Sequence, residues 1–466
     1  MSEAKRFAHL KEVLIGGGVG LVVLALILFG LSISGPNLTN NTASNGNGSS
    51  QASSSASPSA SVQLCSVDKQ INDPLLGNVQ AMVVNAANDQ VLFDVNGEKA
   101  SPTASTMKLL TAAAAMQTFG PNYRVQTRVY RDSADPGTIY LVGGGDPTLS
   151  RTAPGKQSVY QDAPKLNDLA VQINRAVGTT PITKIVADGT LFKGPQWLAG
   201  VEVSERTNGF LGLVSALQVD GDRNDPTRET SPRSANPETR AGGWLKQAIG
   251  ANASTATVVA GTMPTNAMQI ASVQSQPISN WINHMMAVSD NTQAEALARL
   301  VSIDEGFDGS FASLDAAIKQ ALNSANITLD GITIADGSGE STKNAVSPAA
   351  MIKLVKQIYL GAGNLGVIKQ SLPVAGESGS LQSRFTGANV DADGHVFAKT
   401  GWIKHGYTLA GFINAKDGSN LLFVVYALGP NVADNAKAAI DNLVTGFYRC
   451  GASLGPAKLA SPSPSN

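Results

Sequence analysis

Pro102-Thr-Ala-Ser-Thr-Met-Lys-Leu-Leu-Thr-Ala112 carries a serine and a lysine, Ser105 and Lys108, three residues apart. Alanines and leucines that follow a proline and several hydroxyl residues predict a helix whose first turn lies near Ser105. Side chains at positions i and i+3 share a helix face, so the hydroxyl and the amine can come within hydrogen-bonding distance. Such a lysine can be the base for a serine nucleophile when burial or another cation lowers its pKa. Because chance alone produces an S-x-x-K pattern about once or twice in a chain of this composition, other motifs must support it.

Two further triplets add functional groups. Ser289-Asp290-Asn291 precedes a helical stretch, and its hydroxyl can relay a proton while its carboxamide binds a peptide amide and the lysine amine. By itself this triplet also fits an ordinary helix N-cap. Lys399-Thr400-Gly401 ends a predicted strand, where a cation, a hydroxyl and a residue without Cβ can hold an anionic substrate end. By itself this triplet also fits a surface lysine before a turn.

In the order S-x-x-K, S-x-N and K-T-G, these motifs are those of penicillin-binding proteins and class A β-lactamases. From about residue 70 to 450 the chain resembles the D-alanyl-D-alanine carboxypeptidase/endopeptidase family of low-molecular-weight class C penicillin-binding proteins. Further stretches that carry the resemblance are Gly143-Gly-Gly-Asp-Pro-Thr-Leu149, Ser289-Asp-Asn-Thr-Gln-Ala-Glu295, Asp336-Gly-Ser-Gly339, Asn344-Ala-Val-Ser-Pro348, Leu372-Pro-Val-Ala-Gly376, Ala398-Lys-Thr-Gly401 and Leu409-Ala-Gly411. The resemblance implies an α+β fold: a penicillin-binding/serine β-lactamase-like domain, with a mostly antiparallel sheet flanked by helices, that carries a large insertion between the S-x-x-K and S-x-N motifs.

The resemblance also implies a reaction on peptidoglycan stem peptides. Ser105 would attack the carbonyl between two D-alanines while Lys108 takes its proton, so that the terminal D-alanine leaves and an acyl-enzyme remains. Ser289 would pass a proton to the leaving amine, and Asn291 would bind the substrate amide. Penicillins and other β-lactam antibiotics would acylate the same serine, and neither a cofactor nor a metal is implied.

The K-T-G end of the site is implied to bind the substrate. Lys399 and Thr400 would recognise the terminal carboxylate, and Lys399 is also implied to be a catalytic residue. Gly401 and Trp402 would continue the strand beside the carboxylate. The backbone N–H groups of Ser105 and Trp402 would hold the oxyanion. Trp402 stands where the family often has Thr or Ser, so one hydroxyl near the substrate carboxylate is missing.

Two alternative functions remain open. Trp402 suggests a catalytically weak or inactive pseudo-enzyme that binds wall peptides. The other alternative is a β-lactamase, because Glu340-Ser-Thr-Lys-Asn344 is one residue away from the E-x-x-L-N deacylation loop, at a place where the family commonly has Gly-Leu-Ser-Arg. We interpret this likeness as accidental, since Asp336-Gly-Ser-Gly339 and Val346-Ser-Pro348 flank it as in the peptidases. Carboxypeptidase and endopeptidase share this chemistry, and the sequence does not rank them.

Near the N-terminus, Val13 to Ser34 contains no charged residue and is long enough, at about 1.5 Å per residue, to cross a bilayer of about 30 Å. Lys5, Arg6 and Lys11 precede it, which places residues 1–12 in the cytoplasm. We expect a single-pass signal anchor in a bacterial cell membrane with the catalytic body extracytoplasmic. A cleaved leader and a secreted protein are the alternative.

Composition divides the rest of the chain. Residues 35–63 are mostly Ser, Asn, Ala, Gly and Thr, which predicts a disordered linker, and 455–466 predicts a disordered tail. We expect a discontinuous peptidase domain made of 65–120 and 275–452, with 121–274 as inserted material.

Strand and helix patterns support a sheet built from both ends of that domain. Predicted strands are Val79–Asn85, Gln90–Val95, Gly394–Thr400, Thr408–Asn414 and Leu421–Leu428, followed by a helix over Asp434–Tyr448. Within the insertion, strand signals fall at Thr138–Val142, Ile185–Ala187 and Ala256–Ala260.

The chain has two cysteines, Cys65 and Cys450, near opposite ends of the folded region. In an oxidising compartment they favour one disulfide that joins these ends. Two unpaired buried thiols are the alternative.

Charge and motif content argue against other functions. Lys and Arg number 34 against 35 Asp and Glu, so the charge gives no reason to expect nucleic acid as a partner. The four histidines, His9, His284, His395 and His405, form no H-E-x-x-H motif and are interpreted as solvent or scaffold residues. Asp220-Gly-Asp-Arg-Asn-Asp225 resembles a calcium loop but lacks its glycine and final glutamate, and is interpreted as a solvated acidic loop.

Overall fold

The computed structural model describes residues 64–430 and 432–459. The predicted cytoplasmic segment 1–12, the anchor at 13–34 and the linker at 35–63 lie outside the described residues, as does most of the predicted tail. Among the described residues, no helix has both the length and the apolar composition that a membrane span requires.

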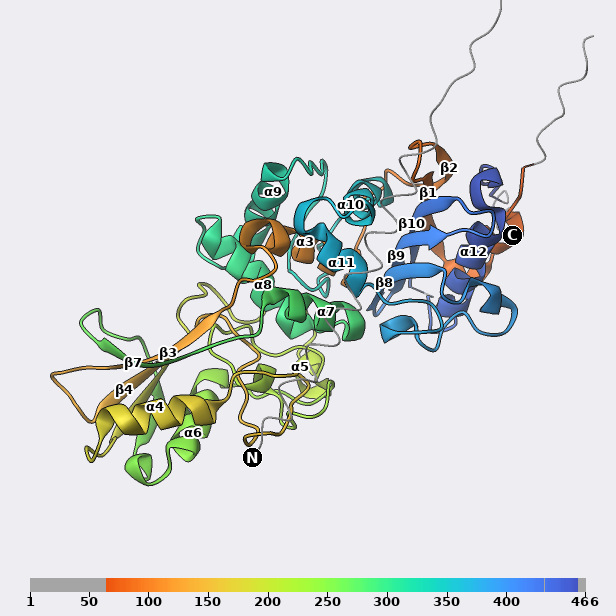
Figure 1. Ribbon diagram of the computed structural model, residues 1–466. Helices are drawn as coiled ribbons and strands as arrows, with labels where there is room; N and C mark the ends of the chain where they lie inside the picture. The colour runs from red at the N-terminus through yellow and green to blue at the C-terminus, as the bar shows by residue number, and fades with distance from the viewer. Residues whose placement is uncertain (1–63, 431, 460–466) are drawn as a thin grey trace, which may run out of the picture. The chain divides into compact units, whose positions relative to one another are not determined.

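One five-stranded antiparallel sheet is built from both ends of the described chain (Figure 1). Its order is β2-β1-β10-β9-β8, which makes β8 an edge strand. The strands are β1 (Asn78–Asn85), β2 (Val91–Val95), β8 (Val396–Ile403), β9 (Gly406–Asn414) and β10 (Asn420–Leu428). The predicted N-terminal hairpin and C-terminal strands are confirmed, with small shifts at their ends.

Both faces of this sheet are covered, which explains why β10 is an apolar strand buried continuously from Leu421 to Ala427. Along β10, Leu422 and Val424 belong to the core that includes α10 (Pro348–Leu360). Phe423, on the opposite face, belongs to the core that includes α12 (Ala436–Cys450). Alternate side chains of one strand therefore hold two cores together.

A group of helices packs around α3 (Lys108–Phe119), the helix that follows the S-x-x-K serine. Its neighbours are α7 (Ile278–Val288), α8 (Asn291–Asp304), α9 (Leu314–Ser324), α10 and α11 (Gly366–Ser371). The alanines at 112–115 are 0% exposed, and their small side chains let neighbouring helices approach α3 closely. A further short helix, α2 (Asp68–Ile71), packs against α12.

Between α3 and α7 the chain forms a second, mixed sheet in the order β6-β5-β4-β3-β7. Its strands are β3 (Gln126–Arg131), β4 (Thr138–Val142), β5 (Lys184–Asp188), β6 (Thr257–Ala260) and β7 (Met268–Gln274). The helices α4 (Leu166–Val177) and α6 (Pro237–Ile249) pack on this sheet and on each other, while α5 (Ser204–Asn208) is short and exposed. The strand signals for β4, β5 and β6 are confirmed, whereas β3 and β7 were not predicted because polar residues interrupt their apolar patterns.

Short 3-10 helices complete the connections. They are η2 (Pro74–Leu76), η3 (Ala104–Met107), η4 (Asp220–Asp222), η5 (Gly250–Ala253), η6 (Phe311–Ser313), η7 (Gly363–Leu365), η8 (Gly379–Leu381), η9 (Gly387–Ala392) and η10 (Gly451–Ser453).

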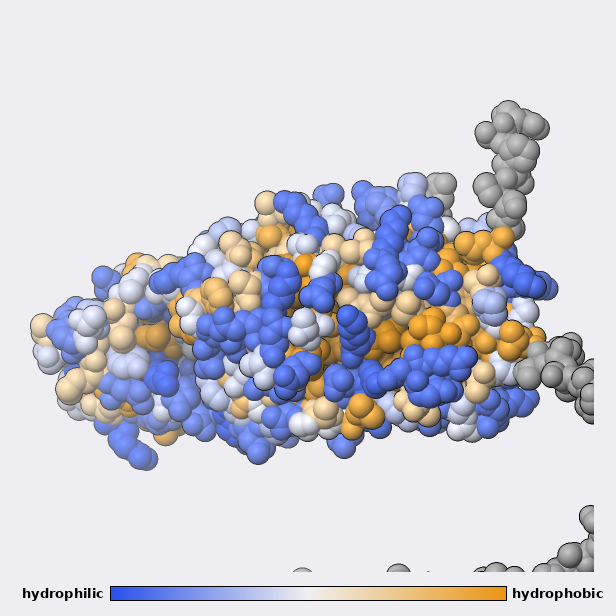
Figure 2. All heavy atoms as spheres, turned by 90° about the horizontal axis from the view of Figure 1, so that it is seen from above, coloured by the Kyte–Doolittle hydropathy of each residue, from blue (hydrophilic) through white to orange (hydrophobic). Residues whose placement is uncertain are grey.

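The surface over these elements is chemically mixed. Figure 2 shows hydrophilic residues interspersed with hydrophobic ones over the face seen from above. Exposed large apolar side chains are ordinary when they are scattered. Phe210, Val288 and Trp402, however, are exposed and line one and the same cavity.

The two ends of the fold are joined covalently. Cys65 and Cys450 form a disulfide with a Cα–Cα distance of 5.4 Å, which confirms the predicted pairing. The Cys65 N–H also donates to the carbonyl oxygen of Ser453 at 2.8 Å. The bond closes a very long loop, so its removal enlarges the unfolded ensemble far more than it changes the folded chain.

We expect the Cys65→Ser/Cys450→Ser double variant to lose about 2–4 kcal/mol of unfolding free energy. Thermal unfolding followed by circular dichroism measures this loss as a lower Tm. Reaction at Ser105 should persist, because neither cysteine lines its cavity. A Tm equal to that of the wild type under both oxidising and reducing conditions would contradict this role of the disulfide.

Candidate active site

Ser105 lies on the 3-10 helix η3, directly before α3. The sequence predicted a helical first turn near Ser105, but the α-helix begins only at Lys108. Ala104 has a φ of 46°, in the left-handed region that residues with a Cβ rarely adopt. Gly339 packs against this turn, and a Cβ there would overlap the carbonyl oxygen of Ala104. A tight, supported turn therefore presents the Ser105 hydroxyl.

The Lys108 amine is fully buried beside this hydroxyl. Its Nζ lies 2.7 Å from Ser105 Oγ, 2.6 Å from Asn291 Oδ1 and 2.8 Å from the carbonyl oxygen of Ser338. Burial lowers the pKa of Lys108 to about 8, although carboxylates nearby, first among them Glu340, oppose the shift. Near neutral pH this lysine therefore loses its proton far more readily than an exposed lysine.

The geometry around Lys108 suits a base. A neutral amine has two N–H donors and one lone pair, and a protonated amine has three donors. The oxygens of Asn291 and Ser338 can only accept, so they take the two N–H groups of the neutral form. The remaining lone pair then faces Ser105 Oγ and can accept its proton.

The Ser338 carbonyl is held in place by buried carboxylates. Glu295 accepts hydrogen bonds from the backbone N–H groups of Gly337 and Ser338 at 3.1 and 2.9 Å. Asp336 accepts from the N–H of Gly339 at 2.7 Å. Burial raises the pKa of Glu295 to about 7 and also raises the pKa of Asp336. Sequence reasoning quoted this stretch for its resemblance but missed its role, because a backbone carbonyl has no side-chain signature.

The S-x-N triplet occupies the junction between α7 and α8. Ser289 has a φ of 63° and ends α7, while Asp290 caps α8 by accepting from the N–H of Gln293 at 3.0 Å. Asn291 begins α8 and faces Lys108. The N-cap interpretation and the functional interpretation are therefore compatible, since different members of the triplet serve each purpose.

A second buried amine, that of Lys399, approaches from β8. It donates to Ser289 Oγ at 2.9 Å and to the carbonyl oxygen of Thr400 at 2.8 Å. Burial, together with the charge of Lys108, lowers the pKa of Lys399 well below its usual value. Two buried amines that lie close together repel each other when both are protonated. This repulsion favours the neutral form of Lys108, the form that can act as a base.

The K-T-G strand needs its glycine for steric reasons. A Cβ on Gly401 would lie 2.8 Å from the backbone nitrogen of Ser105, closer than non-bonded atoms can approach. The next residue, Trp402, is half exposed at the rim. Thr400 Oγ1 donates to Ser380 Oγ at 2.7 Å. The sequence predicted a role for the Thr400 hydroxyl but not for that of Ser380.

These groups share a cavity of about 400 Å³. The predicted residues that line it are Ser105, Ser289, Asn291, Thr400, Gly401 and Trp402. The part of the chain between α3 and α7 contributes Glu205, Phe210 and Thr230 to the wall, and Arg384 and Lys437 add positive charge. All the residues predicted for catalysis and binding thus gather at one place, with Lys108 and Lys399 buried behind the cavity surface.

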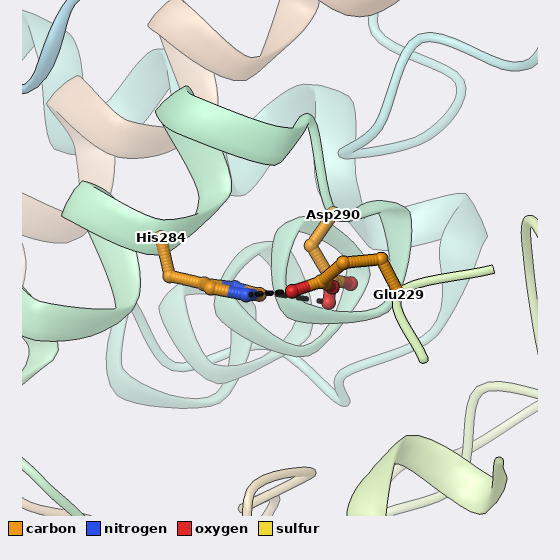
Figure 3. Close-up of side chains that lie close together, drawn as sticks. All are labelled: Glu229, His284 and Asp290. Carbon is orange, nitrogen blue, oxygen red and sulfur yellow. Dashed lines mark hydrogen bonds and ion pairs between the residues drawn. The ribbon is translucent and has the colours of Figure 1, made fainter. Parts of the chain in front are cut away.

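Another cluster links the chain between α3 and α7 to the S-x-N motif. Figure 3 shows Glu229, His284 and Asp290 pointing toward one another. His284 Nε2 lies 2.9 Å from Glu229 Oε1, and Arg223 Nη2 donates to Asp290 Oδ2 at 2.8 Å. Burial lowers the pKa of His284, but Glu229 and Asp290 outweigh it and the net shift is upward. Imidazole and carboxylate can also bind metals, yet Arg223 already occupies Asp290, so the cluster is an ion-pair network.

The loop that resembled a calcium site belongs to the same network. Its interpretation as a solvated acidic loop is wrong for Asp220 and Asp222, which are both buried. Arg151 Nη1 lies 3.0 Å from Asp220 Oδ2, and Arg240 Nη1 lies 3.2 Å from Asp222 Oδ1. The guanidinium groups that pair with these carboxylates come from residues outside the loop, which the local sequence does not reveal.

Comparison with known proteins agrees with this geometry. The sequence matches the D-Ala-D-Ala carboxypeptidase 3 (S13) family over residues 63–232 and 222–447. The chain belongs to the S13 family. It is 34% identical over 384 residues to a carboxypeptidase of Mycobacterium tuberculosis, which covers 81% of this chain and 82% of that relative. It is also 26% identical over 444 residues to a D-alanyl-D-alanine carboxypeptidase of an Actinomadura species, covering 77% and 80% of the two chains.

A solved structure supports the fold. Penicillin-binding protein 4 of Haemophilus influenzae superposes with a TM-score of 0.67 at 20% identity, covering 80% of this chain and 95% of that one. This S13 protein therefore has the α+β penicillin-binding fold that its motifs predicted, and it is a serine-type D-Ala-D-Ala carboxypeptidase. Membership of a cell-wall peptidase family agrees with the expected extracytoplasmic action.

We expect Gly401→Ala to lower the rate of D-alanine release from a D-alanyl-D-alanine peptide by at least ~100-fold, because the new Cβ would collide with Thr408 Oγ1 and with the backbone nitrogen of Ser105 and displace β8. Gly243→Ala on α6 is the matched control, since a Cβ there meets nothing within 4 Å. Both variants should keep the circular dichroism of the wild type. Equal rates for Gly401→Ala and the wild type would show that this close approach is dispensable.

Proposed function

We propose that Ser105 is the nucleophile of this S13 enzyme and that Lys108 is the base of its acylation step. The observation that carries the proposal is the 2.7 Å separation of Lys108 Nζ and Ser105 Oγ, with two carbonyl acceptors on the other sides of the amine. As Oγ bonds to the carbonyl carbon between the two D-alanines, its proton moves to Lys108. The S-x-x-K motif and the lowered pKa of Lys108 both support this assignment.

The tetrahedral intermediate then loses the terminal D-alanine. Ser289, hydrogen-bonded to Lys399 at 2.9 Å, gives its hydroxyl proton to the leaving amine as the C–N bond breaks, and the proton that Lys108 took from Ser105 replaces it. Asn291 binds the substrate amide through its side chain. Water hydrolyses the resulting ester and restores the Ser105 hydroxyl.

Strand β8 supplies the groups that bind the two negative charges of the reaction, the oxyanion and the terminal carboxylate of the substrate. The backbone N–H groups of Ser105 and Trp402 bind the oxyanion, which the close approach of Gly401 to Ser105 supports. Thr400, with the buried amine of Lys399 behind it, binds the terminal carboxylate. Trp402 has no hydroxyl to offer the substrate carboxylate. The Ser380 hydroxyl, 2.7 Å from that of Thr400, supplies this polar contact instead.

The substrate and the antibiotic fit the same chemistry. Peptidoglycan stem peptides that end in D-Ala-D-Ala are the substrates, and β-lactams acylate Ser105 in their place. A complex of the Haemophilus influenzae penicillin-binding protein 4 with a β-lactam supports this inference.

The domain plan and location extend the proposal. Residues 65–120 and 275–452 form the peptidase domain and 121–274 the insertion, a division that the two separate sheets support. The charge-free stretch at 13–34 anchors the chain in the membrane and holds the catalytic body on the outer side.

The decisive experiment is intact-protein mass spectrometry of the full chain after incubation with benzylpenicillin. The wild type should gain one stoichiometric adduct, and Ser105→Ala should gain none because the nucleophilic oxygen is absent. Ser383→Ala, which lines the same cavity, is the control and should keep the adduct.

Other results of the same experiment would support the alternative functions. An adduct on Ser105→Ala would refute the assignment of the nucleophile. Without an adduct on the wild type, rapid loss of the drug would identify a β-lactamase, and intact drug would identify a pseudo-enzyme that binds without turnover.

A further inference from the structure

The carboxamide of Asn291 is held on both sides. Its Oδ1 lies 2.6 Å from Lys108 Nζ, and its Nδ2 donates to Glu340 Oε1 at 2.6 Å. A carboxamide presents an acceptor on one side and donors on the other, so these two partners fix which side faces the amine. Glu340 thus contacts the lysine base through a single intervening side chain.

Glu340 is unusual among the residues around Ser105. It follows the Asp336-Gly-Ser-Gly339 turn, at a position where the resemblance gives leucine. Asn344, its partner in the apparent β-lactamase pattern, donates instead to Asp336 Oδ1 at 2.8 Å, so the two residues of that pattern do not act together. The pattern is accidental, but the carboxylate itself lines the cavity that Ser105 lines.

We infer that Glu340 is a positioning residue of the acylation step, which holds the Asn291 carboxamide with its oxygen on Lys108. The inference rests on the proposed function, because it concerns the activation of Ser105. Without Glu340 the carboxamide can turn over and place its NH₂ group against the amine. That orientation sets donor against donor and removes one of the two acceptors that direct the lone pair toward Ser105.

The charge of Glu340 has a second effect on the same amine. Burial raises the pKa of Glu340 to about 7, while Lys108 opposes the shift and Glu205 and Asp336 add to it. The titratable groups around Lys108 are Glu340, Asp336, Glu295 and Asp290, together with the amine of Lys399, whose own pKa is lowered well below its usual value.

The sign of the effect follows from Coulomb's law. An ionised Glu340 stabilises protonated Lys108, so it raises the pKa of the base and shifts its activation to higher pH. Loss of the charge should therefore let Lys108 act at lower pH, whereas loss of the hydrogen bond should reduce the rate at every pH.

Two variants separate these effects. Glu340→Gln keeps an oxygen that can accept from Asn291 and removes the charge, and Glu340→Leu removes both. The measurement is the second-order rate constant for acylation of the full chain, in detergent, by benzylpenicillin between pH 5.5 and pH 10. For Glu340→Gln we expect the acid limb of the profile to move to lower pH by about 0.5–1 unit, with an unchanged plateau. For Glu340→Leu we expect the same movement and a plateau about 10-fold lower.

Glu98→Gln is the control, since it removes an exposed carboxylate that does not line the cavity. Its acid limb should stay in place, and the Tm of each variant shows that it is folded. An unmoved limb in Glu340→Gln, or equal plateaus in the two Glu340 variants, would overturn the inference. Absence of acylation in every protein, wild type included, would instead refute the proposed function on which it rests.

Discussion

An amine buried without a paired carboxylate is the constraint on which this site depends. Lys108 is 0% exposed and is surrounded by three oxygen atoms within 2.8 Å. Burial disfavours its charge, and the oxygens compensate only in part, so the amine stays close to losing its proton. The packing of α3, with its alanines pressed against α8 and α9, keeps water away from this amine.

The rest of the site supports that amine from three directions. Glu295 and Asp336 hold the turn that supplies the Ser338 carbonyl, and α8 supplies Asn291. From the edge of the sheet, β8 brings a second buried amine, which lies close enough for the two charges to repel. Arg223, from the part of the chain between α3 and α7, reaches the same region and donates to Asp290.

Local motifs made much of this predictable. The three triplets, the strands at both chain ends and the disulfide could be deduced because each depends on short patterns or on very few candidates. What the sequence did not reveal depends on tertiary contacts. Arg223 pairs with Asp290 across a long separation, and the Ser338 carbonyl is backbone. The proximity of Glu340 to Asn291 requires the turn that carries Glu340 to meet the start of α8, which no local pattern reveals.

The pairing of β1 with β10 has a consequence for how the enzyme is made. Asn78 lies opposite Leu428, so the central pair of the sheet joins the beginning and the end of the described chain. A chain that leaves the ribosome or crosses the membrane from its N-terminus presents β1 long before β10 exists, and contacts of such separation form slowly. The apolar β1 is exposed during that interval and is open to aggregation. The same delay is protective, because Ser105 acquires its neighbours on β8 only after most of the chain has emerged. Until then the nascent enzyme cannot react with its substrate or with its inhibitors.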